Sequence, residues 1–523
     1  MPEHAAGALP VIPVDPLPEL LILLPRSGDV GRIKVYYGYL KNLNTDTMRR
    51  IKLIILIFAL ALPACNSGHQ KEQSTDFSSF FRVQTGKPVT LVLACYKTTL
   101  RAGHGEETRV RVSVADSLDR EITDAELPFR ISVTGDANLL DAGRNEITPI
   151  SRADTLTVWE ASLNRGVCEF VLIAGNTPGK FKIEASTEGL WPASHEIHLL
   201  PAGFQLMQPA VLPLPPSPHI RPPMIGADIS FLPQLEDEGM KFYDNGVETD
   251  AIELLKSHGF NYIRLRIFVN PEHEKGYSPG KGYCGYDQTL AMARRVKAAG
   301  LNLLLDFHYS DYWADPQQQY KPSAWEGQDF ENLTASLRKY TATVLAGLKA
   351  QGTLPQMVQV GNEINHGIVW PEGHIGNPDQ LASLLKAGVE ACREADPFMP
   401  VMMHLALGGQ TEEAVFWFDN MLARGVDFDV IGLSYYPRWH GTPEDLSRTM
   451  HTLAERFGKD INVAEYSAFK KEIHDLVFSL PGGRGQGACI WEPLNTWRRL
   501  FDDKGNALDE IRIYDSLAAR YLR

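Results

Sequence analysis

Two glutamates stand where apolar runs of the sequence end, and their type and spacing could do chemistry. Glu363 follows the run MVQVG with an amide, Asn362, directly before it, and Glu465 ends the run INVA. A retaining glycosidase needs two carboxyl groups about 5–5.5 Å apart, one to protonate the leaving oxygen and one to attack the anomeric carbon. A lone carboxylate more often caps a helix or pairs with an arginine. The hypothesis therefore depends on whether the fold brings the two together.

Apolar segments alternate with helical patterns from residue 224 onward, which is typical of a parallel α/β architecture. Helical patterns such as TDAIELLKSHG and TLAMARRVKAAG separate them and end on glycine, as helices often do. Eight such units predict a (β/α)8 TIM barrel. A doubly wound open sheet is the alternative, but it usually begins with a glycine-rich turn, and GADISF has no G-x-G-x-x-G. The expected strands are IGADIS, YIRLRIF, LNLLLDFHY, MVQVGNE, PVMMHLAL, FDVIGLSYY, INVAEYS and GACIWEP.

The carboxyl ends of the strands carry the active site in a barrel of this kind. Strands four and seven face each other, so Glu363 and Glu465 can flank one bound sugar. Arg264 and Arg266 lie two apart on strand two and share a side, and a cation near Glu465 would keep it ionised. Ion pairing within the barrel mouth is an equal alternative for Arg266, Asp228 and Asp306, and His404 could equally lie behind the site. Other strand-end residues are His308, Tyr435, Tyr436, Trp491 and Glu492.

Several blocks are similar to glycoside hydrolase family 53, the endo-β-1,4-galactanases. They are RLRIFVNP, LLLDFHYSDYWADPQQQYKP, VQVGNEINHGIVWPEG, GLSYYPRWHG and GACIWEP. The resemblance covers essentially all of residues 224 to 500. The resemblance implies that Glu363 is the acid/base and Glu465 the nucleophile. It also implies an endo-acting enzyme that cleaves β-1,4-galactan, such as the side chains of pectin, with retention. The substrate-binding residues that it implies are Arg264, His308, Asn362, Tyr435 and Trp491.

The sequence departs from the family pattern at three places. The nucleophile is followed by YSAFKKE, where the family commonly has Thr next, and HLALGG lacks the Asp that often follows this histidine. The loops after strands seven and eight are short, and these loops hold calcium in some relatives. We therefore expect no metal and no cofactor. The number of sugars bound away from the cleaved bond stays open.

The N-terminal segment MRRIKLIILIFALALPAC has a charged start, a short apolar core and a small residue before its cysteine. It resembles a bacterial lipoprotein signal, with Cys65 as the lipidated residue and 48–65 as the signal peptide. Residues 1–47 are then a mis-called extension, with Met48 as the true start. A buried segment or a membrane span is the alternative, but Ile51 to Ala64 is too short to cross a bilayer of about 30 Å. We expect an exported lipoprotein, anchored to a membrane, in the periplasm or on the outer cell surface.

Three further segments precede the expected barrel. Residues 66–87 form a polar linker, and residues 88–203 alternate in short runs such as TRVRVSVAD that predict a β-sandwich. TGDANLLDAGRNE and RGVCEFVLIAGNTPGKFKIEASTEGL resemble the immunoglobulin-like accessory domains of family 2 β-galactosidases. No cluster of residues there suggests chemistry. Residues 204–223 form a proline-rich linker that separates this domain from the hydrolase domain, 224–523.

Composition narrows the function classes. The net charge of -13 disfavours a nucleic-acid partner. The six cysteines include no CxxC pair, so they indicate neither a zinc cluster nor a disulfide scaffold. No Ser-His-Asp elbow, phosphate loop or HExxH motif is present. The expected partner is a neutral polysaccharide, bound by a monomer. Two alternatives stay open: a surface glycan-binding lipoprotein without hydrolysis, and the same mechanism on another neutral β-linked hexan.

Overall fold

The computed structural model describes residues 81–209, 223–496 and 498–522. The described residues all belong to one compact unit, Phe77–Arg523. The predicted signal peptide and Cys65 lie outside the described residues. No helix within the described ranges is long and apolar enough to span a membrane.

The first part of this unit is all β, as the alternating runs predict. Two six-stranded sheets pack on each other, one ordered β1-β5-β4-β10-β7 with β2 beside β4, the other β3-β12-β11-β6-β9-β8. In β4, Val110, Val112 and Val114 are fully buried in the core between the sheets. The immunoglobulin-like relationship stays a prediction. The strands are β1 Arg82–Val83, β2 Thr90–Cys95, β3 Thr99–Arg101, β4 Glu107–Ala115, β5 Glu121–Ile122, β6 Pro128–Thr134, β7 Ala137–Asp141, β8 Ser151–Ala153, β9 Leu156–Ser162, β10 Val167–Ala174, β11 Gly179–Ser186 and β12 Ala193–Leu200.

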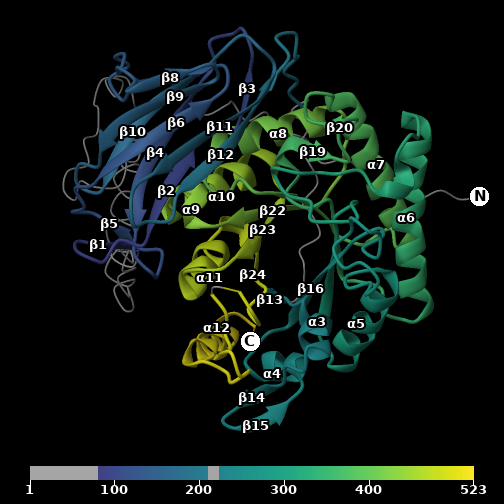
Figure 1. The fold of residues 1–523 in the computed structure, drawn as a ribbon. Helices are drawn as coiled ribbons and strands as arrows, with labels where there is room; N and C mark the ends of the chain where they lie inside the picture. Colours follow the sequence, from purple (N-terminus) through teal and green to yellow (C-terminus); the bar gives the residue numbers. More distant parts are fainter. Residues whose placement is uncertain (1–80, 210–222, 497, 523) are drawn as a thin grey trace, which may run out of the picture. The chain divides into compact units, whose positions relative to one another are not determined.

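The second part is a closed barrel in which each strand pairs in parallel with the next, and Figure 1 shows helices around its strands. All eight predicted strands are present, so the TIM-barrel prediction is confirmed. The strands are β13 Met224–Asp228, β16 Tyr262–Ile267, β17 Asn302–Phe307, β18 Met357–Val360, β21 Val401–Leu405, β22 Val430–Tyr435, β23 Asp460–Tyr466 and β24 Gly485–Trp491. The short pairs are β14 Phe242–Asp244 with β15 Val247–Thr249, and β19 Gly367–Ile368 with β20 Gly373–His374.

Side chains fill the barrel in layers, because every second residue of a strand points inward. One buried apolar layer includes Tyr262, Leu304, Met357 and Met402. Two residues further along the same strands, the inward positions become polar. Those residues are Arg264, Asp306, Gln359 and His404, all buried.

The helices between the strands carry the expected end signals. Asp250 caps α4 by accepting from the Ile252 amide, and Thr442 and Asp445 form a capping box on α10. Gly259 and Gly300 follow α4 and α5 with positive φ, as predicted for helix ends. The helices are α3 Leu232–Asp237, α4 Ala251–Ser257, α5 Tyr286–Ala298, α6 Phe330–Ala350, α7 Pro378–Ala395, α8 Thr411–Ala423, α9 Pro437–His440, α10 Pro443–Phe457, α11 Lys470–Phe478 and α12 Ile513–Tyr521.

The sandwich contacts the barrel through polar groups. Glu413 of α8 accepts from the Thr98 amide at 2.5 Å and from the Thr99 hydroxyl at 2.7 Å. Arg498 pairs with Asp119 at 2.5 Å. The predicted boundary in the proline-rich linker stays a prediction, because residues 210–222 lie outside the described ranges.

Candidate active site

Glu363 reaches the barrel mouth because the strand before it is broken by a tight turn. β18 ends at Val360, and Gly361 follows with φ of 90°. A Cβ at Gly361 would meet the Ile364 side chain at 2.6 Å, so this close approach requires glycine. Glu363 itself has φ of 47°, a conformation that non-glycine residues rarely adopt and that is enriched at functional sites.

Glu465 faces the barrel interior through an irregularity in β23. Ala464 belongs to the apolar interior layer, so regular alternation would turn the next residue outward. The register of β23 against β24 shifts between Val463 and Tyr466, and the register of β22 against β23 shifts before Glu465. A bulge of this kind re-aims a side chain. Glu465 thereby points toward the same cavity as Glu363.

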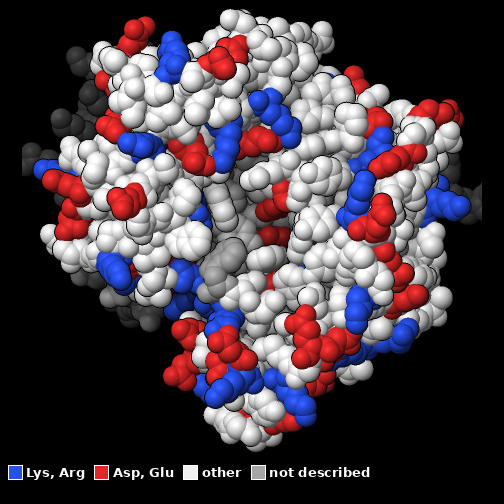
Figure 2. Space-filling view, viewed as in Figure 1, with Lys and Arg blue, Asp and Glu red and all other residues white. Residues whose placement is uncertain are grey.

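Both glutamates line one open cavity of about 400 Å³ at the barrel mouth. Figure 2 shows this face hollowed, with acidic side chains visible inside the hollow. Trp313, Tyr436, Trp439 and Trp491 also line the cavity. Aromatic faces with a few hydrogen-bonding groups suit a neutral, hydroxyl-rich ligand.

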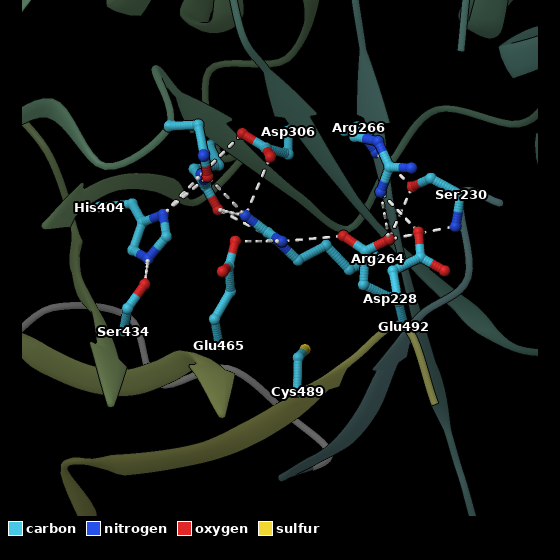
Figure 3. A network of polar contacts seen from close by, with 12 residues as sticks. Asp228, Ser230, Arg264, Arg266, Asp306, His404, Ser434, Glu465, Cys489 and Glu492 are labelled. Atoms are coloured by element: carbon cyan, nitrogen blue, oxygen red, sulfur yellow. Dashed lines mark hydrogen bonds and ion pairs between the residues drawn. The ribbon is translucent and has the colours of Figure 1, made fainter. Parts of the chain in front are cut away.

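Arg264 connects the polar groups beneath the cavity. Its guanidinium pairs with Asp228 at 2.8 Å, with Asp306 at 2.9 Å and with Glu465 at 2.8 Å (Figure 3). It also donates to the Asn362 side-chain oxygen at 2.9 Å. Because Arg264 is only 1% exposed, these partners hold it in one position. Asn362 in turn donates to the Ala314 carbonyl at 2.9 Å.

The two glutamates have different partners. Glu465 has the Arg264 cation and the hydroxyl of Tyr436, which donates to Oε2 at 2.9 Å. Glu363 has the neutral hydroxyl of Ser434, which donates to Oε1 at 2.6 Å. Burial and the charge of Glu465 raise the pKa of Glu363 well above its usual range. Burial raises the pKa of Glu465 as well, and Arg264 offsets part of that rise. The two environments therefore favour the proton on Glu363 and the negative charge on Glu465.

A short chain of hydrogen bonds orients Glu363 from behind. His404 Nδ1 lies 3.0 Å from the Gln359 side-chain nitrogen and 3.0 Å from Asn362 Oδ1, and the Glu363 amide donates to it at 3.4 Å. The two amide donors favour a proton on Nε2, which lies 2.9 Å from Ser434 Oγ. Burial lowers the pKa of His404 well below its usual range, and the nearby Arg264 lowers it further, so the ring is neutral. His404 therefore donates to Ser434, and Ser434 donates to Glu363. His404 acts behind the site, one of the two roles that the sequence left open.

Four of the five predicted substrate-binding residues line the cavity with the glutamates: Arg264, His308, Asn362 and Trp491. His308 accepts from the Ala314 amide at 3.1 Å and lies 3.1 Å from Asp306. Tyr435 is not among the lining residues. It is buried, and its hydroxyl donates to the Gly441 carbonyl at 3.0 Å. The next residue, Tyr436, lines the cavity in its place, because Ser434 and Tyr436 point inward while Tyr435 points outward.

Arg266 and Asp228 take the ion-pairing role that the sequence left open. Arg266 pairs with Glu492 at 2.5 Å and with Asp228 at 3.5 Å. Its guanidinium also lies over the rings of Phe231 and Trp313, at 4.3 and 4.4 Å. This second buried cation supports the cavity floor beside Arg264.

Sequence reasoning missed two barrel residues, Ser434 and Gln359, and four residues of the sandwich. Ser434 and Gln359 could have been predicted from the sequence, because each lies two residues after an inward-facing residue on the same strand. The sandwich contributors Thr98, Ser194, His195 and Glu196 gave no signal, because nothing local in β12 indicates what it packs against. Across the described ranges, no group of His, Cys, Asp and Glu side chains is arranged to hold a metal ion.

A closed parallel barrel with two carboxyl groups facing one cavity at its mouth, and an arginine bound to one of them, is the arrangement of the barrel glycoside hydrolases. The sequence model of glycosyl hydrolase family 53 matches residues 224–477. A Niallia circulans protein described as an uncharacterized protein in the bgaB 5′ region is 38% identical over 345 residues, 55% of this chain and 92% of that protein. The probable arabinogalactan endo-β-1,4-galactanase A of Neosartorya fischeri is 32% identical over 303 residues, 51% of this chain and 83% of the relative.

The solved catalytic domain of the Ignisphaera aggregans family 53 protein has 32% sequence identity and a TM-score of 0.53. The match covers 59% of this chain and 99% of that domain. The chain therefore belongs to glycosyl hydrolase family 53 and is a glycosidase. The family prediction is confirmed.

Proposed function

We propose that the chain is a retaining, endo-acting β-1,4-galactanase in which Glu363 is the acid/base and Glu465 the nucleophile. The observation that carries the proposal is the asymmetry between two carboxyl groups in one cavity. Glu465 pairs with the Arg264 cation, whereas Glu363 receives only a neutral hydroxyl. Environments that push the pKa values of two carboxyl groups apart in this way leave one group as a proton donor and the other as a nucleophile.

In the first step, the Glu465 carboxylate attacks the anomeric carbon while Glu363 gives its proton to the glycosidic oxygen, and the leaving sugar departs. Arg264 and Tyr436 hold Glu465 in its ionised form and fix its direction. The Ser434 hydroxyl donates a hydrogen bond to Oε1 of Glu363, so the proton that is transferred lies on Oε2. The products are a covalent glycosyl-enzyme and a shortened chain.

In the second step, Glu363 is ionised and takes a proton from water, whose oxygen attacks the same anomeric carbon. The bond to Glu465 breaks, and the sugar leaves with its original configuration. Asn362, held by Arg264 and by the Ala314 carbonyl, is placed to bond a sugar hydroxyl during both steps. Trp491 offers an aromatic face for the sugar ring.

Galactan is the proposed substrate because of the family and the relatives' names, and because aromatic side chains line the cavity, which suits a neutral sugar. The test is a panel of potato-type galactan, mannan and mixed-linkage glucan, assayed for new reducing ends. Galactan should be cleaved fastest, with a mixture of oligosaccharides appearing early. Faster release from mannan or glucan would reassign the sugar. Binding of galactan without any release would favour a glycan-binding protein.

A further inference from the structure

One wall of the cavity comes from the β-sandwich and not from the barrel. Ser194, His195 and Glu196 of β12, with Thr98 before β3, line the same cavity as Glu363 and Glu465. The predicted division into an accessory domain and a hydrolase domain gives the sandwich no part in the site.

The sandwich wall is fixed to the barrel beside the proton donor. Thr98 Oγ1 lies 3.2 Å from His366 Nε2, and His366 stands three residues after Glu363. His198 of β12 stacks on His366 with ring centroids 3.5 Å apart and lies 2.9 Å from His374. With Glu413 bound to Thr98 and Thr99, these contacts hold β12 in place at the cavity edge.

The wall lies on the side of the cavity where the leaving group must be. It adjoins segments that follow β18, β21 and β22: Gln410 donates to the Cys95 carbonyl at 3.2 Å, and Arg438 to the Pro192 carbonyl. Trp491 and Trp313 lie across the barrel, with centroids 6.3 Å apart. Because the acid must reach the glycosidic oxygen and the nucleophile the anomeric carbon, the leaving sugar lies on the Glu363 side.

Two polar atoms of this wall are available to a ligand. Glu196 Oε1 accepts from Lys180 at 2.7 Å and lies 3.0 Å from His198, whereas Oε2 has no hydrogen-bond partner among the described residues. The Ser194 hydroxyl likewise has no such partner within the described ranges. Both residues are half-buried and lie two apart on one face of β12. Trp439 lines the cavity beside them and offers an aromatic face.

We propose that β12 of the sandwich forms a binding site for leaving-group sugars, in which Ser194 and Glu196 bond sugar hydroxyls beside the Trp439 ring. The sandwich then determines which chain lengths are cleaved well. This inference rests on the proposed hydrolase function and adds a specificity role for a domain outside the barrel.

The test compares two substrates with the same glycone: a β-1,4-galacto-oligosaccharide with two or more leaving-group sugars, and an aryl galactobioside whose leaving group is one aryl ring. In the full chain with Ser194→Ala and Glu196→Gln, kcat/KM should fall roughly fivefold more for the oligosaccharide than for the aryl substrate. Gln keeps the oxygen that accepts from Lys180 and His198, and Ser194→Ala alone should act in the same direction.

The matched control carries the same two changes at the far edge of the same sheet, Ser151→Ala and Glu160→Gln, where both residues are exposed. It should leave the ratio of the two kcat/KM values unchanged. An equal loss on both substrates, or no loss on either, would overturn the proposal. The comparison uses whichever polysaccharide series the wild-type chain cleaves, so a wrong sugar does not affect it. If no series is cleaved, the proposed function fails, and calorimetric binding of the oligosaccharide by the same variants tests the wall by itself.

Discussion

A single cation distinguishes the two glutamates. Arg264 bonds Glu465 directly, whereas burial and the charge of Glu465 raise the pKa of Glu363, so loss of a proton is easier at Glu465 than at Glu363. Arg264 also satisfies Asp228 and Asp306, which would otherwise be buried charges without a cation at this distance. Breaking such a network is costly because each partner is left uncompensated. The site is thus fixed by residues that themselves do not touch the cleaved bond.

Ser434→Ala should change the pH dependence of hydrolysis. The Ser434 hydroxyl stabilises the ionised form of Glu363 and so lowers its pKa. Without it, the pKa of Glu363 rises, and because Glu363 must be protonated in the first step, the basic limb of kcat/KM should move to higher pH. Loss of one hydrogen bond to a charged group, about 1.5–3 kcal/mol, should also lower kcat roughly tenfold to a hundredfold.

The matched control for Ser434 is Ser230→Ala. Ser230 is a buried hydroxyl that donates to Asp228 at 2.7 Å, without a contact to Glu363. In Ser230→Ala, the basic limb of the pH profile of kcat/KM should stay at the wild-type position. A basic limb that moves to lower pH in Ser434→Ala, or that moves equally in both variants, would contradict the orienting role of Ser434.

At the scale of elements, the ends of two strands position the two glutamates of the site. β18 delivers Glu363 through the Gly361 turn, and β23 delivers Glu465 through a register shift. Both are local departures from regular strand geometry, and both stand at the positions where the chemistry occurs. Irregularities of this kind are retained where they re-aim a functional side chain.

Gly361→Ala should lower both activity and stability. The new Cβ would lie 2.6 Å from Ile364 and in a backbone conformation that suits glycine, so the turn must shift and move Glu363. We expect kcat to fall at least about tenfold, with a loss of roughly 2–3 kcal/mol in the free energy of unfolding. Steady-state kinetics and thermal unfolding measure the two effects.

Gly352→Ala provides the control, because Gly352 also has positive φ but a Cβ there meets nothing within 4 Å. It should cost about 1 kcal/mol of stability and leave kcat unchanged. Similar kcat values in the two alanine variants would show that the close approach to Ile364 does not position Glu363.

The sequence predicted the barrel well because each strand is a separate apolar run between helical patterns. It also predicted that Glu363 and Glu465 meet, since opposite strands of a closed barrel face one cavity. It erred at Tyr435, where the strand end alone did not reveal which of two adjacent tyrosines points inward. It could not place Ser194 or Glu196, because their role depends on contacts between segments more than 150 residues apart.

At the scale of the whole molecule, the sandwich and the barrel are joined by buried polar contacts. Glu413 is buried and takes hydrogen bonds from Thr98 and Thr99, while its neighbour Glu412 forms an exposed pair with Lys97 at 2.8 Å. A buried acceptor with several donors is worth far more than an exposed ion pair. The two adjacent glutamates thus offer a direct comparison.

Glu413→Ala should weaken the attachment of the sandwich, because two threonine hydroxyls and an amide lose their buried acceptor. We expect a loss of about 2–4 kcal/mol in calorimetric stability, with the sandwich and barrel transitions moving apart. Glu412→Ala should change stability by less than about 0.5 kcal/mol. Equal effects from the two variants would contradict the role of Glu413 at this interface.

Membrane anchoring through Cys65 stays a prediction from the sequence. Cys65→Ala should prevent lipid attachment, since only a cysteine thiol accepts the lipid at this position of the signal. The variant should move from the detergent phase to the aqueous phase, or stay unprocessed, when expressed in a bacterium that lipidates the wild-type chain. Unchanged partitioning into detergent would rule out the anchor.

The stereochemistry of azide rescue tests the two glutamate roles most directly. In Glu465→Ala, azide can replace the missing nucleophile and should give an α-glycosyl azide, with inversion. In Glu363→Ala, an activated aryl galactobioside still forms the covalent intermediate, and azide should release a β-glycosyl azide, with retention. NMR of the products distinguishes the two. A β-azide from Glu465→Ala, or an inverted product from the wild-type chain, would contradict the assignment of acid and nucleophile.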